Sequence, residues 1–235
     1  MGEAALREYV ASLMDTSFDR RTPEPEAMEE TADEYASIDF SESNAAFVRE
    51  LAVVIPERAF VADLGCGPGD IPILLAVARP DLSIVGLDLS PAMLEIAAQR
   101  AAEAGVGDRL RWRVGDVAEL VFDVGELDFV YSHTTLHHLP NIRACFEQTA
   151  RALRQGGGYY LRDLRRPASA REAAEWIETA SGDSLTARQY ALFFYSLLAS
   201  YTPDEVELDL AAASLHSRVV VPPEYNRYWV ASGTR

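Results

Sequence analysis

The stretch that decides the fold is Val61-Ala62-Asp63-Leu64-Gly65-Cys66-Gly67-Pro68-Gly69-Asp70. Its apolar beginning is typical of a buried strand, and its glycines, in the spacing G-x-G-x-G, allow a tight turn before a helix. At the carboxyl edge of a parallel sheet, such a loop lets a ligand lie against the main chain. Asp63, just ahead of the glycines, argues against a dinucleotide because its carboxylate would lie beside the pyrophosphate. An acid at this position suits a ligand with a cationic head.

Two further carboxylates end the next strands of the pattern. Asp88 closes the second predicted strand 23 residues after Gly65, where an acidic residue can accept both hydroxyls of a ribose. In Gly115-Asp116-Val117, after the third strand, a carboxylate can accept an amino group while a neighbouring backbone N–H donates to a ring nitrogen. A cationic head, a ribose and an aminated ring together describe S-adenosylmethionine.

Short apolar runs alternate with longer helical patterns from about residue 59, which indicates a parallel sheet wrapped by helices. The predicted strands cover residues 59–64, 83–88, 110–115, 126–132, 159–164, 217–221 and 227–232, and the predicted helices cover 70–78, 91–104, 142–154, 169–180, 187–200 and 203–212. We expect an α/β fold with a doubly wound, seven-stranded, mostly parallel sheet, a terminal antiparallel hairpin, an N-terminal helical cap and a helical insertion after the fifth strand. Residues 1–50 are expected to form the cap or arm, and residues 51–235 the core, with the insertion at about 168–212.

Four segments occur in the order and at the spacing of a known family: Asp63-Leu64-Gly65-Cys66-Gly67-Pro68-Gly69, Gly86-Leu87-Asp88-Leu89-Ser90-Pro91-Ala92-Met93-Leu94, Gly115-Asp116-Val117 and Leu127-Asp128-Phe129-Val130-Tyr131-Ser132. On these segments the chain resembles the class I S-adenosylmethionine-dependent methyltransferases, from about Ala59 to Ser232. The resemblance implies a Rossmann-like fold, S-adenosylmethionine as the cofactor, and the transfer of its methyl group to a small-molecule acceptor.

The resemblance also assigns roles to individual positions around the cofactor. It implies that Gly65 and Gly67 approach the methionine part, that Asp88 binds the ribose hydroxyls and that Leu89 and Met93 flank the adenine. The N-terminal segment resembles a cap that folds over the cofactor, in which Tyr35 is the expected contact. The expected cofactor-binding residues are Tyr35, Asp63, Gly65, Cys66, Gly67, Asp88, Leu89, Met93, Asp116, Val117 and Ser132.

Three of the four histidines lie within six residues, at His133, His137 and His138, directly after the fourth predicted strand. Histidine is the side chain whose ordinary pKa best suits proton removal near neutrality. His133 is the favoured general base, with His137 and Asp163 as further catalytic candidates; the alternative is that the histidines pack against or cap the next helix. We expect no metal site, because no cysteine or glutamate stands at ligand spacing from the adjacent His137 and His138.

Two arginines, Arg165 and Arg166, follow the fifth strand on the expected acceptor side. They can clamp a carboxylate or phosphate of an acidic substrate, or instead pair with Glu172 and Glu175 of the next helix or with the acidic N-terminal arm. Tyr195 lies in an apolar helical stretch over residues 190–201. That stretch is interpreted as core or a homodimer contact, with a part, including Tyr195, that roofs the acceptor pocket.

The charge of the chain restricts its partners. The 37 acidic and 21 basic residues of the 235 give a formal net charge of −16, and every basic residue is an arginine. The absence of lysine excludes Schiff-base catalysis and the lysine of a P-loop, and the acidic balance argues against a nucleic-acid partner. Residues 1–40 hold 11 acids and three arginines, which predicts either a solvated arm or a segment that folds over an active site.

No secretory signal and no apolar run long enough to span a membrane is visible, so we expect a cytoplasmic protein without membrane contact. The predicted activity is methyl transfer from S-adenosylmethionine to a small, possibly acidic, molecule. The alternatives are another enzyme that uses this cofactor, namely a carboxymethyl-donor synthase or a cyclase, and a protein that binds the cofactor without turnover. The sequence does not identify the acceptor atom or the acceptor.

Overall fold

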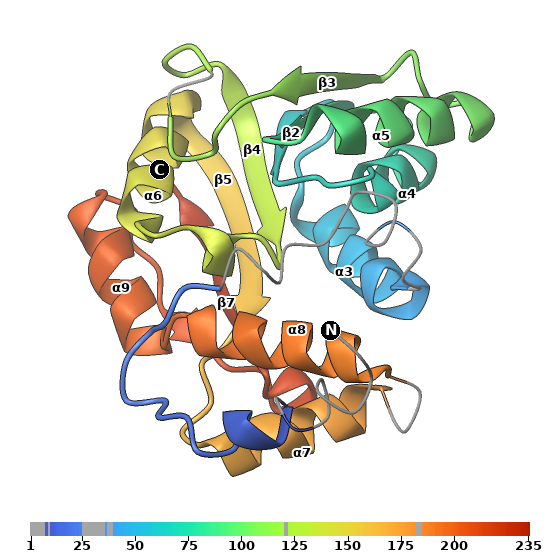
Figure 1. The fold of residues 1–235 in the computed structure, drawn as a ribbon. Helices are drawn as coiled ribbons and strands as arrows, with labels where there is room; N and C mark the ends of the chain where they lie inside the picture. The colour runs from blue at the N-terminus through green and yellow to red at the C-terminus, as the bar shows by residue number, and fades with distance from the viewer. Residues whose placement is uncertain (1–7, 9, 25–35, 37–39, 120–121, 182–184) are drawn as a thin grey trace.

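A central sheet of seven strands organises the computed structural model, which describes residues 8, 10–24, 36, 40–119, 122–181 and 185–235. Its strand order is β3-β2-β1-β4-β5-β7-β6 (Figure 1). The bounds are β1 Phe60–Leu64, β2 Ser83–Asp88, β3 Leu110–Val114, β4 Leu127–His133, β5 Leu153–Leu164, β6 Val219–Val220 and β7 Tyr228–Thr234. Only β7 runs against its neighbours, because it pairs antiparallel with both β5 and β6. The expected sheet with its terminal antiparallel hairpin is therefore confirmed.

The strand order reverses between β1 and β4, which both lie in the middle of the sheet. β1 pairs in parallel with β2 on one side and with β4 on the other. The chain therefore leaves β1 and β4 toward opposite halves of the sheet, and this reversal is the switch point at which open α/β sheets generally form a crevice for their ligands. The glycine loop and the histidine-rich segment, which follow β1 and β4, meet at this position.

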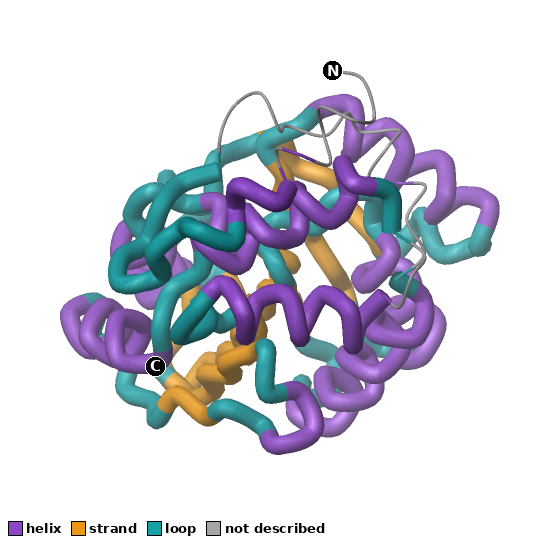
Figure 2. The backbone as a smooth tube through the Cα atoms, turned by 60° about the horizontal axis from the view of Figure 1, so that its bottom comes forward, coloured by secondary structure: helices purple, strands orange, loops and turns teal. Residues whose placement is uncertain are grey.

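Helices cover both faces of the sheet (Figures 1 and 2). The helices against the two faces are α3 Ser41–Val54, α4 Asp70–Ala78, α5 Pro91–Glu103, α6 Ile142–Ala152 and α9 Pro203–Ala212, whereas α7 Ala170–Ser181 and α8 Ala187–Ala199 pack on each other beyond the carboxyl end of β5. One hydrophobic cluster joins α3, α4 and α5 to one face, and a second joins α6 and α9 to the other. In the described part of the chain, none of the helices has the length and apolar character needed to cross a membrane.

Local signals in the sequence set several helix starts. Ser90 caps α5 by accepting a hydrogen bond from the Met93 N–H, and a proline occupies the first turn. Thr186 with Gln189 forms a capping box at α8, and Thr202 with Glu205 does so at α9. Because such signals are local, these three helices begin where the sequence predicts.

The largest difference from the predicted elements lies before β5. The helix expected to end at residue 154 ends at Ala152, and β5 begins at Leu153 instead of residue 159. The glycines at 156–158, interpreted as a helix end, lie inside the strand. Gly156 has φ +76°, and the pairing of β4 with β5 shifts register between Leu127 and Phe129. The glycines thus allow a bulge, which the apolar pattern of a regular strand does not reveal.

A third hydrophobic cluster joins the helical insertion to the N-terminal segment. Phe18 packs edge-on against Phe194 of α8 with ring centroids 5.4 Å apart, and the Thr22 N–H donates to the Leu198 carbonyl. Leu13 is buried in the same cluster. The described part of the acidic arm, residues 10–24, thus packs on the insertion and extends to the carboxyl end of the sheet.

Helix α3 packs on the sheet. It spans residue 50, which the sequence analysis predicts as the boundary between the arm and the core. Phe47 and Leu51 are fully buried against Val61 and Tyr131. The division of the chain at residue 50 stays a prediction.

We expect Leu51→Ala to lower the free energy of unfolding by about 2–5 kcal/mol, because it leaves a cavity beneath α3. Val53 is 85% exposed on the same helix, so Val53→Ala is the matched control and should change stability by no more than about 0.5 kcal/mol. Chemical denaturation of both variants measures the difference. Equal effects would contradict the placement of α3 in the core.

Candidate cofactor and acceptor site

The glycine loop turns sharply after β1 and is held by the neighbouring strand. The N–H groups of Gly65 and Cys66 both donate to the Leu87 carbonyl, at 2.8 and 3.0 Å. Gly65 has φ +74°, and a Cβ atom there would lie 2.0 Å from Cγ2 of Thr135. Position 65 therefore needs glycine both for its backbone angle and for the close approach of the segment that follows β4.

Asp88 joins the glycine loop to the start of α5. One carboxylate oxygen accepts the Gly67 N–H at 2.8 Å, and the other accepts the Ser90 N–H at 2.9 Å. The side chain is half-buried, and each oxygen has a further lone pair. Since Ser90 supplies the cap of α5, the Asp88 carboxylate is not needed for capping and instead holds the glycine loop against the start of α5.

Asp63 is a buried acid at the end of β1. It is 2% exposed, and its Oδ2 has no hydrogen-bond partner among the described residues. Burial raises the pKa of this carboxyl well above its usual range, with the nearby Tyr131 hydroxyl acting in the opposite direction. An orphaned buried carboxylate oxygen is costly unless it is protonated or meets a cation, so the site fits a ligand with a positively charged head.

The other expected cofactor residues surround the same edge of the sheet. The Asp116 carboxylate accepts the Ala118 N–H at 2.8 Å. Leu89 is 70% exposed directly after β2, and Val117 is buried. Met93, in the first turn of α5, is half-buried. An exposed leucine at this edge offers an apolar surface to a flat ring.

Two of the expected residues have structural contacts that occupy their side chains. Ser132 is fully buried, and its hydroxyl donates to the Leu64 carbonyl at 2.8 Å, which ties β4 to β1. Cys66 is buried, and burial raises the pKa of its thiol, so it is not a nucleophile. Tyr35 lies outside the described residues.

The first two residues after His133 were missed by the sequence reasoning. The Thr135 hydroxyl donates to the Gly65 carbonyl at 3.0 Å, and its backbone N–H donates to Asp163 at 2.9 Å. Thr134 has φ +52°, a conformation that a β-branched residue rarely adopts. Strain of this kind clusters at functional sites, but no sequence pattern announces it.

His133 is enclosed at the end of β4. It is 7% exposed, stacks on Phe47 with ring centroids 4.5 Å apart, and accepts a hydrogen bond from Arg162 at 3.3 Å. Burial and the charge of Arg162 lower the pKa of His133 to about 3. The imidazole is therefore neutral at physiological pH and is a weak proton acceptor.

His137 forms a buried pair with Asp163, so the structure brings together two of the catalytic candidates from the sequence. His137 Nδ1 lies 2.7 Å from Asp163 Oδ1, and the two side chains are 4% and 1% exposed. Burial acts to raise the pKa of Asp163, but the His137 pair and the backbone N–H groups of Leu136 and Leu164 outweigh it and lower the pKa. The carboxylate orients the His137 ring.

The arginines after β5 are already paired. Arg165 forms an ion pair with Glu172 at 3.1 Å and lies over the Trp176 ring. Arg166 is buried and pairs with Glu205 at 2.7 Å. Arg165 thus pairs with Glu172 of the next helix, α7, which is the alternative to a substrate clamp. Arg166 pairs instead with a residue of α9, which the sequence did not predict.

Tyr195 of α8 is half-buried and packs against the third cluster, the one that joins the insertion to the N-terminal segment. It lies in the layer of helices that extends beyond the carboxyl end of β5 (Figure 1). Its interpretation as part of a roof over the acceptor stays a prediction.

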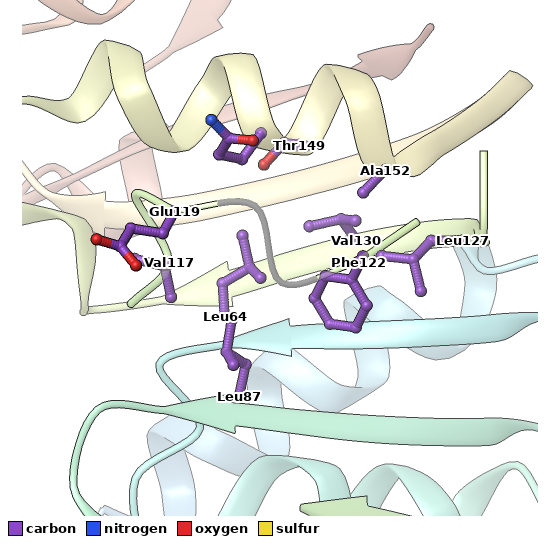
Figure 3. A pocket seen from close by; sticks show the side chains of 10 residues that line it. Leu64, Leu87, Val117, Glu119, Phe122, Leu127, Val130, Thr149 and Ala152 are labelled. Atoms are coloured by element: carbon purple, nitrogen blue, oxygen red, sulfur yellow. The ribbon is translucent and has the colours of Figure 1, made fainter. Parts of the chain in front are cut away.

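An apolar pocket lies between the sheet and α6 (Figure 3). Leu64 and Leu87 enter it from β1 and β2, and Thr149 and Ala152 from α6. Its free volume of about 10 Å³ is that of roughly one water molecule. It is therefore a gap in packing beneath the crevice and not the place where a cofactor binds.

Comparison with known proteins gives a family to this geometry. Residues 61–157 match the family described as a methyltransferase domain. Over 134 residues the chain is 35% identical to the 27-O-demethylrifamycin SV methyltransferase of Amycolatopsis mediterranei, covering 56% of this chain and 48% of that protein. Over 122 residues it is 37% identical to the trans-aconitate 2-methyltransferase of Deinococcus radiodurans, covering 50% and 43%. The chain spans about half the length of the curated relatives it matches.

A solved structure shows the same fold. A SAM-dependent methyltransferase from Aquifex aeolicus superposes with a TM-score of 0.65 at 15% identity, covering 88% of this chain and 99% of that one. The matched domain includes the glycine loop, Asp88 and Asp116, together with the histidines after β4. Residues 61–157 thus match a methyltransferase domain, and in this domain, its strand order and its glycine loop the chain is similar to the class I S-adenosylmethionine-dependent methyltransferases.

Proposed function

We propose that this protein binds S-adenosylmethionine in the crevice between β1 and β4 and transfers its methyl group to a small-molecule acceptor. The observation that carries the proposal is Asp88, whose carboxylate bridges Gly67 and Ser90 at the switch point of the sheet. The orphaned oxygen of Asp63 adds a buried carboxyl group behind the same loop, and a cationic ligand would favour its ionised form. Together the two acids suit the ribose and the cationic part of this cofactor.

The residues of the crevice position the reactants. The loop from Gly65 to Gly69 holds the methionine part, Asp88 accepts the ribose hydroxyls, and Asp116 accepts the amino group of the adenine. The sulfonium of the bound cofactor supplies an electrophilic methyl group that needs no activation by the protein. Most of the rate enhancement is therefore expected from holding the acceptor in line with this group.

His133 is not proposed as a strong base, although it is the favoured candidate from the sequence. A group with a pKa of about 3 accepts a proton poorly near neutrality. His133 instead fills the end of β4 and contacts Phe47 and Arg162. This arrangement supports the alternative interpretation, in which the histidine packs, and leaves positioning as the main contribution to catalysis.

The acceptor is proposed to be a small acid. One relative is named for trans-aconitate, an acid, and arginines follow β5 on the acceptor side. Of the two, Arg165 is the one able to exchange partners, because its side chain is 21% exposed and that of Glu172 is 29% exposed. Arg166, 5% exposed, keeps its bond to Glu205. A cytoplasmic location and a homodimer stay proposals of the same kind.

We expect Asp88→Ala to weaken S-adenosylmethionine binding by at least about 100-fold, because two hydrogen bonds to a charged acceptor are lost at about 1.5–3 kcal/mol each. Asp108→Ala is the matched control, since its side chain is 82% exposed on the turn before β3, away from the crevice. Isothermal titration measures both affinities, and thermal melts without cofactor report any loss of folding. Equal binding by the wild type and Asp88→Ala would contradict the cofactor site.

His133 should also leave a signature in the pH dependence of stability. Its pKa is lower in the folded than in the unfolded chain, about 3 against the ordinary 6.5, so only the unfolded chain binds the proton between these values. The free energy of unfolding should therefore fall as pH drops through this window, on the order of 2–3 kcal/mol further in the wild type than in His133→Gln by pH 4. Denaturation curves from pH 7 to pH 4 test this, and parallel curves would contradict a neutral His133.

For the acceptor, we expect Arg165→Gln to raise KM for an acidic acceptor about tenfold, because an ion pair with the substrate is lost. Arg171→Gln, at a side chain 87% exposed on α7, should leave KM unchanged. A panel of small carboxylic acids and their amides, read by product mass, supplies the acceptor. Turnover of amides but not of acids would contradict an acidic acceptor.

The same mass measurement separates the remaining alternatives. A product that gains one methyl group supports methyl transfer, whereas a carboxymethylated or cyclised product identifies another chemistry on the same cofactor. Tight cofactor binding with no product from any acceptor would favour a protein that binds without turnover.

A further inference from the structure

A cluster of three potential metal ligands lies where the N-terminal segment meets the loop after β4. Glu24 comes from the N-terminal segment, and His137 and His138 form the short 3-10 helix η2, Leu136–His138. One ligand atom of each lies within 4.8 Å of the others. Spacing along the chain does not predict this cluster, because Glu24 is 114 residues away from His138.

The His137 ring is fixed in the orientation of a metal ligand. Its Nδ1 is bonded to Asp163 at 2.7 Å, while its Nε2 faces Glu24 Oε1 at 4.0 Å. A carboxylate that accepts the hydrogen of one ring nitrogen leaves the lone pair of the other nitrogen for a metal. Asp163 is 1% exposed and also accepts the N–H groups of Thr135 and Leu136, so its own position is fixed by the fold.

The carboxylate of Glu24 lies between the two histidines. Its Oε2 is 2.7 Å from His138 Nδ1, and its Oε1 accepts the hydroxyl hydrogen of Ser196 on α8. In tetrahedral coordination, ligands about 2.0–2.1 Å from zinc are about 3.3 Å from each other. The distance from Glu24 to His138 Nδ1, 2.7 Å, is shorter than this value, and the distance from Glu24 to His137 Nε2, 4.0 Å, is longer. Small side-chain shifts would therefore bring both imidazoles and the carboxylate to bonding distance from one ion.

We propose that Glu24, His137 and His138 bind a divalent transition-metal ion, with zinc as the preferred ion, and that Asp163 orients His137 from behind. Two imidazoles and one carboxylate are ligands that zinc accepts. The carboxylates of Glu24 and Asp163 offset the two positive charges of the ion. The side chain of His138 is 52% exposed, which leaves an entry path and an open fourth position.

The bound ion would connect two parts of the chain. Residue 24 continues from the segment that packs on α8, and the histidines continue from β4. A metal at this point would tie the arm to the carboxyl end of the sheet. We therefore expect the ion to raise the melting temperature of the protein in addition to binding at one equivalent per chain.

Metal-free, tag-free protein titrated with Zn²⁺ in competition with a chromophoric chelator tests the proposal. We expect one Zn²⁺ per chain and an affinity at least about tenfold lower in Glu24→Gln and in His138→Gln. His216→Gln, which removes the exposed histidine outside the cluster, is the matched control and should bind as the wild type does. Circular dichroism and melting without metal show whether each variant is folded.

Co²⁺ substitution identifies the ligands directly. We expect visible absorption bands of a nitrogen- and oxygen-ligated ion without a thiolate charge-transfer band, since Cys66 and Cys145 are both buried away from the cluster. A thiolate band, or a Zn²⁺ affinity that is the same in the wild type, Glu24→Gln and His138→Gln, would overturn the proposal. Neither titration uses turnover, so the result is independent of the proposed methyl transfer.

Discussion

The buried carboxylate of Asp163 is the group on which the acceptor end of the molecule depends. It accepts hydrogen bonds from the backbone of Thr135, Leu136 and Leu164 and pairs with His137. A charge 1% exposed is tolerated only when its lone pairs are filled, and here the fold fills them with the segment that follows β4. Because Thr135 in turn contacts Gly65, the carboxylate also sets how closely that segment covers the glycine loop.

On the opposite side of the crevice, hydrogen bonds from backbone N–H groups hold the glycine loop in place, and ion pairs among the described residues do not. The Leu87 carbonyl accepts two N–H groups of the glycine loop, and Asp88 accepts a third. The loop is therefore held in place by its neighbour β2 before any ligand arrives. Preorganisation of this kind reduces the entropy that binding would otherwise cost, which is the main advantage of building a site on strand ends.

Elements with local signals could be predicted from the sequence, and contacts between distant segments could not. The caps at Ser90, Thr186 and Thr202 each involve residues within three positions, so the start of each helix follows from the sequence. The glycine loop, together with Asp88, was identified in the same way, because spacing along the chain fixes which strand ends meet. The partner of Arg166, in contrast, is Glu205 on α9, and nothing in the spacing selects it over Glu175.

The same reasoning explains what the sequence could not predict around the histidines. His133 is the favoured base because it follows a strand, but its pKa is lowered by burial and by the charge of Arg162, which comes from β5. The position of Glu24 beside His138 likewise depends on how the N-terminal segment packs on α8. Burial and pairing of this kind are properties of the folded chain, and one sequence shows only the residue types.

The two edges of the sheet bear on how this protein behaves at high concentration. At one edge β6 is only two residues long, and at the other β3 carries the exposed Arg111 together with Arg113, which lies over the Phe122 ring. Short edge strands and charged edge side chains both discourage the backbone pairing that leads to aggregation. A strand of a second copy of the chain therefore has little opportunity to pair with either edge. Both edges of the sheet are thus protected from edge-to-edge association, although neither is covered by a further strand.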